Sequence, residues 1–279
     1  MGGRSDRWTV GLFLPLLLLA SGAPAQVAPN DATLYLHPTD VSDARALWVN
    51  PAGLGHFPEA SVHLDLTVGD PGAKGQLRQL TLGLNSRGLS LGYQRDLFSS
   101  GRRGHTYKLG YAAGRGGLAA GFATALYRGG TSGTGWDVGI LYDWTPAVSV
   151  GGVIQNIGQP VVRDSTLRVT YVPSATLQLA GRRVVLSALS RLTSDGVTGY
   201  GFGLRGALRA GTSLPLGLLA RLDTDRSLHR SRLAFGCSLG GEDAAGLVAT
   251  TPGDAHRIDA LSLYGVSTRR FTSARRSKP

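Results

Sequence analysis

The sequence predicts an all-β fold, a transmembrane antiparallel up-and-down β-barrel of about fourteen strands behind a short N-terminal helical segment. Three observations predict it. Between Ala60 and Thr268 the chain repeats a unit of about nine to twelve residues in which apolar side chains alternate with small or polar ones, as in a strand with two unlike faces. The breaks between these units alternate in length along the chain. The chain also begins with the residue pattern of an export signal.

The first 25 residues have the features of a cleavable signal peptide. Arg4 and Arg7 give a positive start, Val10 to Ala20 is an apolar run, and Ala23-Pro24-Ala25 fits the cleavage pattern. The apolar run is too short to span a bilayer as a helix. We therefore expect a signal peptide over residues 1–25, an N-terminal hatch or plug over 26–59, a barrel over 60–268 and a basic tail over 269–279.

The lengths of the breaks predict how the barrel sits in a membrane. Outer-membrane barrels have tight turns on the periplasmic side and longer loops outside, which fits this chain if both termini are periplasmic. Short breaks fall at Asn85-Ser86, Gly114 to Gly116, Thr145-Pro146, Gly181-Arg182, Ala210 to Ser213 and Gly240 to Glu242. Longer ones fall at Gly69 to Gly75, Asp96 to Gly104, Arg128 to Thr134, Ile157 to Ser165, Asp223 to Arg230 and Pro252 to His256, with a shorter exception at Ser194 to Gly196.

The two faces of each predicted strand differ in kind. Apolar residues occupy every second position in 80–84, with Leu80, Leu82 and Leu84 on one side, and in 136–144, where Trp136 and Trp144 lie at the ends like interfacial aromatic residues. The opposite face is mostly Gly, Ser, Ala, Thr and Gln. A soluble β-sandwich is the rival fold, but its core would need large residues there. The register of the last strand, 258–268, stays open, because Ile258, Ala260 and Tyr264 compete with Leu261 and Leu263 for the outer face.

Charge and motifs give no sign of an enzyme or of a nucleic-acid partner. The formal net charge of +11 comes from cations in the predicted loops and tail, where anionic lipid headgroups or solvent are the expected partners. Cys237 shares the apolar face of its strand, so we expect a lipid-facing residue. The glycine strings 201–206 and 88–92 lie within alternating strands and lack the following helix that a nucleotide loop or a nucleophile elbow requires. The histidines show no zinc spacing, so no cofactor, metal or catalytic residue is predicted.

The segment before the first strand is the most informative for function. In Asp40 to Gly55, Ser42 or Asp43 could cap a short helix through Trp48, and Asn50-Pro51 would end it. Such an element would form a plug ahead of the barrel. The alternative is that Asn50-Pro51 is only a helix stop and turn.

The string 48–55, Trp-Val-Asn-Pro-Ala-Gly-Leu-Gly, resembles the signature that opens the barrel in the FadL-type family of fatty-acid and hydrocarbon channels. It also resembles the start of PorV/PorQ-type proteins of the type IX secretion system, to which Gly152 to Gly158 is similar as well. The resemblance implies a fourteen-stranded barrel with an N-terminal hatch in the lumen. We therefore take Asn50, Pro51 and Trp48 as candidate gating residues. The chain is too short for the long extracellular loops of the fatty-acid transporters, which favours a compact, PorV-like barrel.

From this resemblance we expect a barrel in the bacterial outer membrane that is either a passive channel for hydrophobic or small solutes or an accessory component of protein export. The expected partners are outer-membrane lipid and either hydrophobic small molecules or a secretion-system protein. The alternative is a structural or interaction barrel with a closed lumen and no transport activity. An outer-membrane enzyme is the third and weakest hypothesis, and no ligand-binding residue is predicted.

Overall fold

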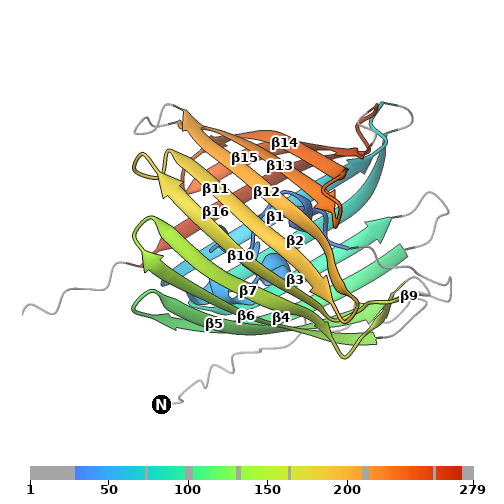
Figure 1. Cartoon of the computed structure of the whole chain (residues 1–279), viewed down its shortest axis with the longest axis horizontal. Coiled ribbons are helices and arrows are strands. Elements are labelled where there is room, and N and C mark those ends of the chain that lie inside the picture. The colour runs from blue at the N-terminus through green and yellow to red at the C-terminus, as the bar shows by residue number, and fades with distance from the viewer. Residues whose placement is uncertain are drawn as a thin grey trace, which may run out of the picture.

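The computed structural model describes residues 29–72, 75–97, 103–129, 133–162, 165–208, 214–253 and 256–271. The predicted signal peptide, residues 1–25, lies outside the described residues, as does the predicted basic tail from residue 272 onward. The described chain is one closed barrel with a short N-terminal segment inside it (Figure 1).

Fourteen antiparallel strands form the barrel, and β1 pairs with β16 to close it, which confirms the predicted fold class. β7 pairs directly with β10, because the chain between them forms a separate two-stranded ribbon. The barrel strands are β1 (Glu59–Gly69), β2 (Gln76–Ser86), β3 (Leu89–Leu97), β4 (Arg103–Arg115), β5 (Leu118–Arg128), β6 (Gly133–Thr145), β7 (Val148–Ile157), β10 (Thr170–Leu179), β11 (Val184–Thr193), β12 (Gly196–Leu208), β13 (Leu216–Asp225), β14 (Arg230–Gly240), β15 (Asp243–Pro252) and β16 (Ala260–Arg270), and the ribbon is β8 (Val161–Val162) with β9 (Ser165–Thr166).

The two rims of the barrel differ mostly as the breaks in the sequence predict, but the β12–β13 connection, predicted to be short, spans residues 209–215. One rim, here called the short-turn rim, carries the tight connections together with the start of β1 and the end of β16. Its first turn is centred on Arg87 and Gly88, which have φ values of 51° and 90°. Positive φ at two successive turn residues matches the right-handed twist of the paired strands. The other, the long-loop rim, carries the longer connections, including the β8–β9 ribbon.

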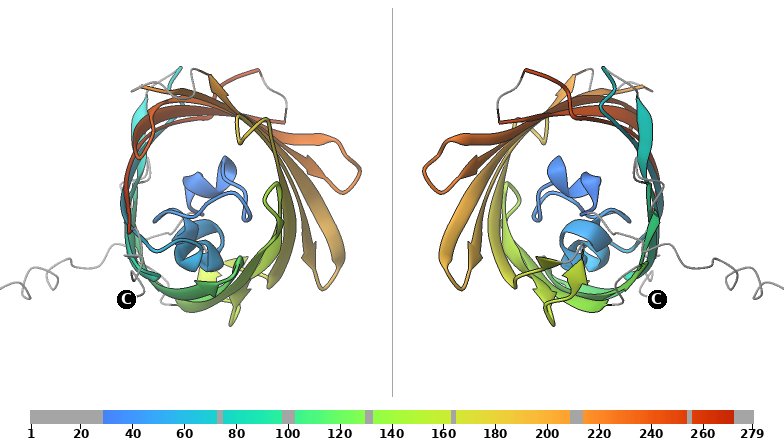
Figure 2. Two further views of the ribbon diagram at one scale, coloured as in Figure 1. Left: turned by 90° about the vertical axis from the view of Figure 1, so that its left-hand side faces the viewer. Right: turned by 90° about the vertical axis from the view of Figure 1, so that its right-hand side faces the viewer.

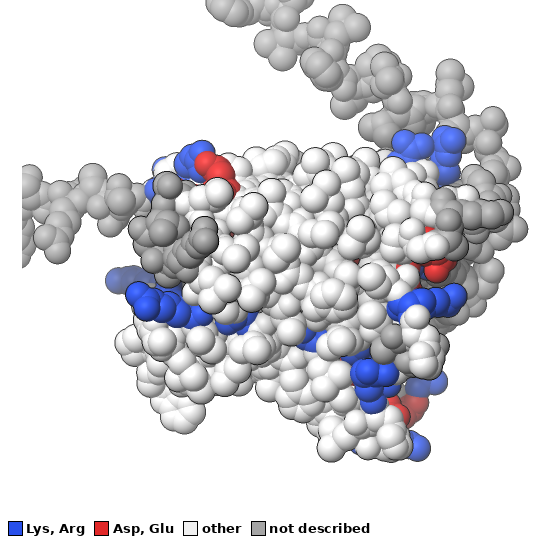
Figure 3. All heavy atoms as spheres, turned by 90° about the horizontal axis from the view of Figure 1, so that it is seen from above, with Lys and Arg blue, Asp and Glu red and all other residues white. Residues whose placement is uncertain are grey.

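The outer surface is the apolar face that the alternation predicts. Leu82 is 41% exposed and Phe235 is 44% exposed, while Thr81, beside Leu82 but facing inward, is 1% exposed. Trp136 and Trp144 both face outward, and so does Cys237. Much of the surface between the two ends of the barrel is uncharged in Figure 3. A closed barrel with this outer surface can span a bilayer with every backbone group paired.

The sequence leaves open which residues of the last strand face inward. The contacts of this strand inside the barrel answer that question. Leu261 and Leu263 point outward, whereas Ala260 and Tyr264 point into the barrel. The Tyr264 ring stacks on that of Tyr35, with centroids 5.6 Å apart. An aromatic partner inside the lumen therefore decides the face that hydrophobicity alone does not.

The N-terminal segment, residues 29–58, runs through the barrel interior, as both end-on views in Figure 2 show. It contains the short helices η1 (Asp31–Leu34), α1 (Ala46–Val49) and η2 (Pro51–Gly55). Leu47 and Leu54 are fully buried in one apolar cluster with Ala112 and Ala123 of the barrel wall. Burying such a leucine stabilises a fold by about 1.5–3 kcal/mol. None of the helices among the described residues is both long and apolar enough to cross a membrane.

The sequence places the end of α1 correctly but not its start. α1 ends before Asn50, but neither Ser42 nor Asp43 caps it: the N-cap position is Arg45, which makes no side-chain cap. The Asp43 carboxylate instead accepts hydrogen bonds from the backbone N–H and the guanidinium of Arg45. A nearby cation is a stronger partner for a carboxylate than a neutral N–H donor, so the ion pair replaces the cap.

Candidate functional site

Inward-facing glycines on six strands let the N-terminal segment lie directly against the barrel wall. A Cβ at Gly83 would lie 3.5 Å from Ala44 Cβ, and one at Gly92 would lie 2.7 Å from Trp48 Cζ2. A Cβ at Gly121 would lie 2.6 Å from Pro51 O. Gly83 and Gly92 are cross-strand partners, as are Gly121 and Gly139, so the space left by their missing side chains continues from one strand to the next. These wall glycines, which the segment covers, are Gly83, Gly92, Gly110, Gly121, Gly139 and Gly203.

Asn50 joins two helices of the segment to the wall. Its backbone N–H donates to Ala46 O at the end of α1, and its Oδ1 accepts from Ala52 N at the start of η2. Its Nδ2 donates to Pro38 O at 3.0 Å and to Ile140 O on β6 at 3.3 Å. The side chain is fully buried, and its amide is therefore bonded at both ends, as a buried amide requires.

Pro51 and Trp48, the other two candidate residues, lie on either side of Asn50. Pro51 is buried as the first residue of η2, where its fixed φ suits a helix start. Trp48 is 5% exposed, and its ring packs over Gly92 with the Lys108 ammonium 5.6 Å from the ring centroid. The structure therefore brings Asn50, Pro51 and Trp48 together inside the lumen.

Two cations of the wall hold carbonyl groups of the segment, and neither is among the residues predicted from the sequence. Lys108 Nζ donates to Leu47 O at 3.0 Å and pairs with Asp137 Oδ2 at 2.5 Å. Arg221 donates to Thr33 O at 2.8 Å and also to Leu36 O, at the C-terminal end of η1. Cations are favoured where the last carbonyls of a helix lack partners. We call these contacts the Lys108 clamp and the Arg221 clamp.

The alternation of apolar and polar side chains in the sequence indicates both clamp residues. Lys108 lies between Tyr107 and Leu109, and Arg221 lies between Ala220 and Leu222, at positions that must face inward if their neighbours face lipid. A charge at mid-strand on the inner face needs a partner in the lumen.

The start of the segment is bonded to the long-loop half of the wall. Asn30 Nδ2 donates to Gln94 Oε1 at 2.9 Å and to Thr81 Oγ1 at 3.1 Å. Asp31 N donates to Gln79 Oε1 at 2.8 Å. Burial raises the pKa of the Asp31 carboxyl to about 6, although the cations Arg78 and Arg232 act in the opposite direction.

The segment divides the lumen into two cavities. One, of about 450 Å³, lies in the long-loop half, and the other, of about 590 Å³, lies toward the short-turn rim. Leu36 lines both, and Trp48 lines only the first. We call them the long-loop cavity and the short-turn cavity.

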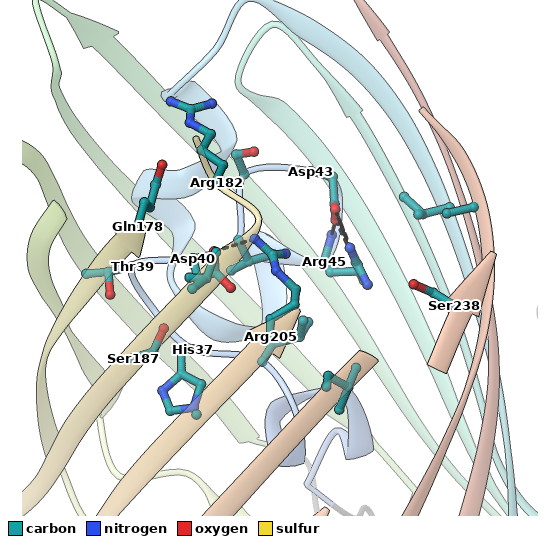
Figure 4. A pocket seen from close by; sticks show the side chains of 18 of the residues that line it. His37, Thr39, Asp40, Asp43, Arg45, Gln178, Arg182, Ser187, Arg205 and Ser238 are labelled. Atoms are coloured by element: carbon teal, nitrogen blue, oxygen red, sulfur yellow. Dashed lines mark hydrogen bonds and ion pairs between the residues drawn. The ribbon is translucent and has the colours of Figure 1, made fainter. Parts of the chain in front are cut away.

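The short-turn cavity is lined by an ion pair between the segment and the wall and by one within the segment (Figure 4). Asp40 accepts from Arg205 of β12 at 2.8 Å, and Asp43 pairs with Arg45 at 2.6 Å. Burial would raise the pKa of Asp43, but the Arg45 guanidinium outweighs it and holds that pKa below its usual value. His37 packs on β12 with both ring nitrogens unbonded, and burial lowers its pKa to about 3. No group of side chains in the described ranges has the composition of a metal site.

The β8–β9 ribbon turns into the mouth of the long-loop cavity instead of extending outward. Val162 is 4% exposed and lines this cavity together with Leu167. Pro160 packs over the backbone at Gly133 and Gly135 of β6. The sequence predicts only a long loop over 157–165, because nothing in the composition of this loop indicates which way it folds.

These features define a class of protein: an outer-membrane-type β-barrel whose lumen holds its own N-terminal segment. No protein-family model and no curated protein matches the sequence. Solved structures match the fold. The CymD monoaromatic hydrocarbon channel matches with a TM-score of 0.56 and 10% identity, over 90% of this chain and 100% of that one.

Two further structures are similar at the same level. The Pseudomonas putida toluene transporter TodX matches with a TM-score of 0.51 and 10% identity, over 88% of this chain and 97% of that one. A bacterial polysaccharide outer membrane secretin matches with a TM-score of 0.50 and 12% identity, over 76% and 98%. The chain therefore has a FadL-like outer-membrane barrel fold, as the Asn-Pro-Ala string suggests.

Proposed function

We propose that this chain is a passive channel of the bacterial outer membrane for small, largely hydrophobic solutes, and that its N-terminal segment is the hatch that controls passage. In this proposal the signal peptide directs export and the short-turn rim faces the periplasm. Asn50, Pro51 and Trp48 are the gating residues, because they pack the hatch directly against the wall glycines.

The division of the lumen by residues 29–58 is the observation that carries the proposal. Fourteen strands enclose more space than their own side chains fill, and here that space is two cavities with the segment between them. The segment contacts the wall through side-chain hydrogen bonds and ion pairs, while the strands pair only with one another. A displacement of the segment would therefore join the two cavities and leave the barrel intact.

The similar structures support the kind of solute. CymD and TodX are described as a monoaromatic hydrocarbon channel and a toluene transporter, and both share this fold. In this chain, Leu34, Val49, Val172 and Leu189 give the long-loop cavity an apolar part that suits a hydrophobic solute.

The alternative is a structural or interaction barrel with a permanently closed lumen, for example as an accessory component of protein export. The Lys108 and Arg221 clamps favour it, because both are buried and bonded on both sides. Truncating one partner of such a buried pair costs about 3–5 kcal/mol of folding stability. Contacts of this strength would fit a permanent plug as well as a gate.

Conductance of the refolded protein in planar bilayers distinguishes the two. The channel proposal expects small, intermittent currents from wild type. It expects larger currents from an Asn50→Ala/Pro51→Ala variant, with folding checked by heat-dependent gel mobility. Currents that stay absent from both correctly folded proteins would reject the channel and leave the interaction barrel.

A further inference from the structure

The charged side chains of the long-loop cavity are unbalanced in favour of cations. Four cationic side chains line it against two carboxylates. The Lys108 clamp uses one carboxylate, Asp137, at 2.5 Å. The other three cations are Arg191 of β11, Arg221 of β13 and Arg232 of β14, and the second carboxylate among the lining side chains is Asp223 of β13.

Asp223 is already engaged by two of the three. Arg191 Nη2 and Arg221 Nη2 bind the same oxygen, Asp223 Oδ1, at 2.8 Å and 3.0 Å. Arg191 reaches it across β12 at Gly201, where a Cβ would lie 2.9 Å from that oxygen. Arg221 is also bonded to the hatch and is 2% exposed, but the side chain of Arg191 is 32% exposed, so it has donors left for a further partner.

Arg232 lies directly opposite Asp223 in the β13–β14 register. Within the described part of the chain it forms no ion pair, and its Nε is buried without a hydrogen-bond partner. A buried donor without a partner is unfavourable, so the site is incomplete as it stands.

The rest of the cavity wall has neutral polar side chains, such as Thr106 and Gln155, and an apolar part, here called the apolar wall, that includes Leu34, Leu189 and the rings of Trp48 and Tyr127. A neutral hydrocarbon that filled the cavity would remove water from Arg191 and Arg232 without offering them a hydrogen-bond acceptor. An inorganic anion would satisfy the guanidinium groups but leave the apolar wall in contact with water. A solute that carries both a carboxylate and an apolar ring meets both requirements, and about 450 Å³ is enough space for a small one.

We propose that the long-loop cavity is a binding site for small aromatic carboxylates, whose carboxylate is held by Arg191 and Arg232 and whose ring lies against the apolar wall. This assignment rests on the proposed channel function and narrows its solutes to organic anions.

Benzoate is the probe, and binding is measured by tryptophan fluorescence of the protein in lipid nanodiscs. Trp48 lies at the cavity, and a Trp48→Phe variant identifies its part of the signal. We expect Arg191→Gln and Arg232→Gln each to weaken benzoate binding by about tenfold or more, since hydrogen bonds to charged groups are the strong ones. Arg103→Gln, the same change at an exposed position on the long-loop rim, should leave binding unchanged.

Three further probes test the chemistry. Toluene has the ring without the charge, acetate has the charge without the ring, and benzylammonium has the ring with the opposite charge. Benzoate should bind more tightly than each of them, and Arg191→Gln should remove its advantage over toluene. Equal binding of benzoate and benzylammonium, or benzoate binding that Arg191→Gln and Arg232→Gln leave intact, would overturn the proposal. If these variants fail to fold, the salt dependence of benzoate binding to wild type decides, because an anion site must weaken with ionic strength.

Flux through vesicles separates this inference from the channel proposal. Vesicles that pass neutral solutes through the protein with no benzoate binding would reject the anion site and keep the channel. Benzoate binding without any flux would keep the site and reject the channel.

Discussion

The ammonium group of Lys108 on β4 lies 3.0 Å from the carbonyl oxygen of Leu47 in α1 and 2.5 Å from Asp137 on β6. One wall cation therefore bonds the hatch and is itself held by a second strand. This contact links the closure of the lumen to a single replaceable charge.

Lys108→Met should release α1 and raise conductance. It removes two charge-assisted hydrogen bonds and leaves Asp137 buried without its cation, a loss of about 3–5 kcal/mol. Planar-bilayer recordings measure the conductance. Adding Asp137→Leu should restore folding stability but not the closed state, because the bond to Leu47 O is still missing. A folded Lys108→Met protein with wild-type conductance would count against the clamp.

Gly139→Ala should also open the lumen. A Cβ at Gly139 overlaps Asn50 Oδ1 and comes within 3.3 Å of Pro51 Cδ, so the hatch cannot keep its present position. Gly265→Ala is the matched control, because a Cβ there meets nothing within 4 Å. We expect increased conductance from the first variant only, and equal conductance in the two would show that the contact at Asn50 is not limiting.

Phe235→Arg should destabilise the barrel in bilayers by roughly 2–4 kcal/mol, the cost of an arginine on the lipid face at mid-depth. Ser238→Arg on the same strand should cost much less, because Ser238 lines the short-turn cavity. Thr81→Arg is unsuitable as the control, since Thr81 is 1% exposed and bonded to Asn30. Urea titrations in lipid vesicles measure the difference, and similar losses for Phe235→Arg and Ser238→Arg would mean that the surface is not in lipid.

The hatch should be held less tightly in its position against the barrel wall, here called its seating, as the pH rises. Burial raises the pKa of Asp31 from 3.8 to about 6 in the folded state, so the folded state binds the proton more strongly. The contribution of Asp31 is therefore complete below about pH 4 and is lost as the pH rises through about 6. Acrylamide quenching of Trp48, in a variant with Trp136 and Trp144 replaced by Phe, reports the seating. Asp31→Asn should flatten the profile between pH 4 and 6, and an unchanged profile would remove Asp31 from the account.

The sequence predicts the barrel well because strand alternation is a local property. Leu82 and Thr81 differ in exposure, as expected for neighbouring residues that face opposite sides of a strand. The alternation fails to indicate which residues face inward only where apolar residues occupy both faces, as at Tyr264 and Leu263. The start of α1 is also missed, because the ion pair between Asp43 and Arg45 outcompetes the expected cap.

The site is less predictable because it depends on contacts between distant strands. Asn50, Pro51 and Trp48 can be named from a short string, but Lys108 meets Leu47 across 61 positions and Arg221 meets Thr33 across 188. The shared carboxylate Asp223 likewise depends on Gly201 leaving space for Arg191. Only a closed barrel with known register brings such residues together.

A reversible crosslink between hatch and wall tests the central claim most directly. Ala44 Cβ and the Cβ position of Gly83 lie 3.5 Å apart, within the range for a disulfide, so Ala44→Cys with Gly83→Cys should crosslink once Cys237→Ser removes the native thiol. We predict that single-channel currents of this variant are abolished by oxidation and return on addition of dithiothreitol. Equal currents in the oxidised, fully crosslinked protein and the reduced protein would contradict the claim that residues 29–58 control passage through the barrel.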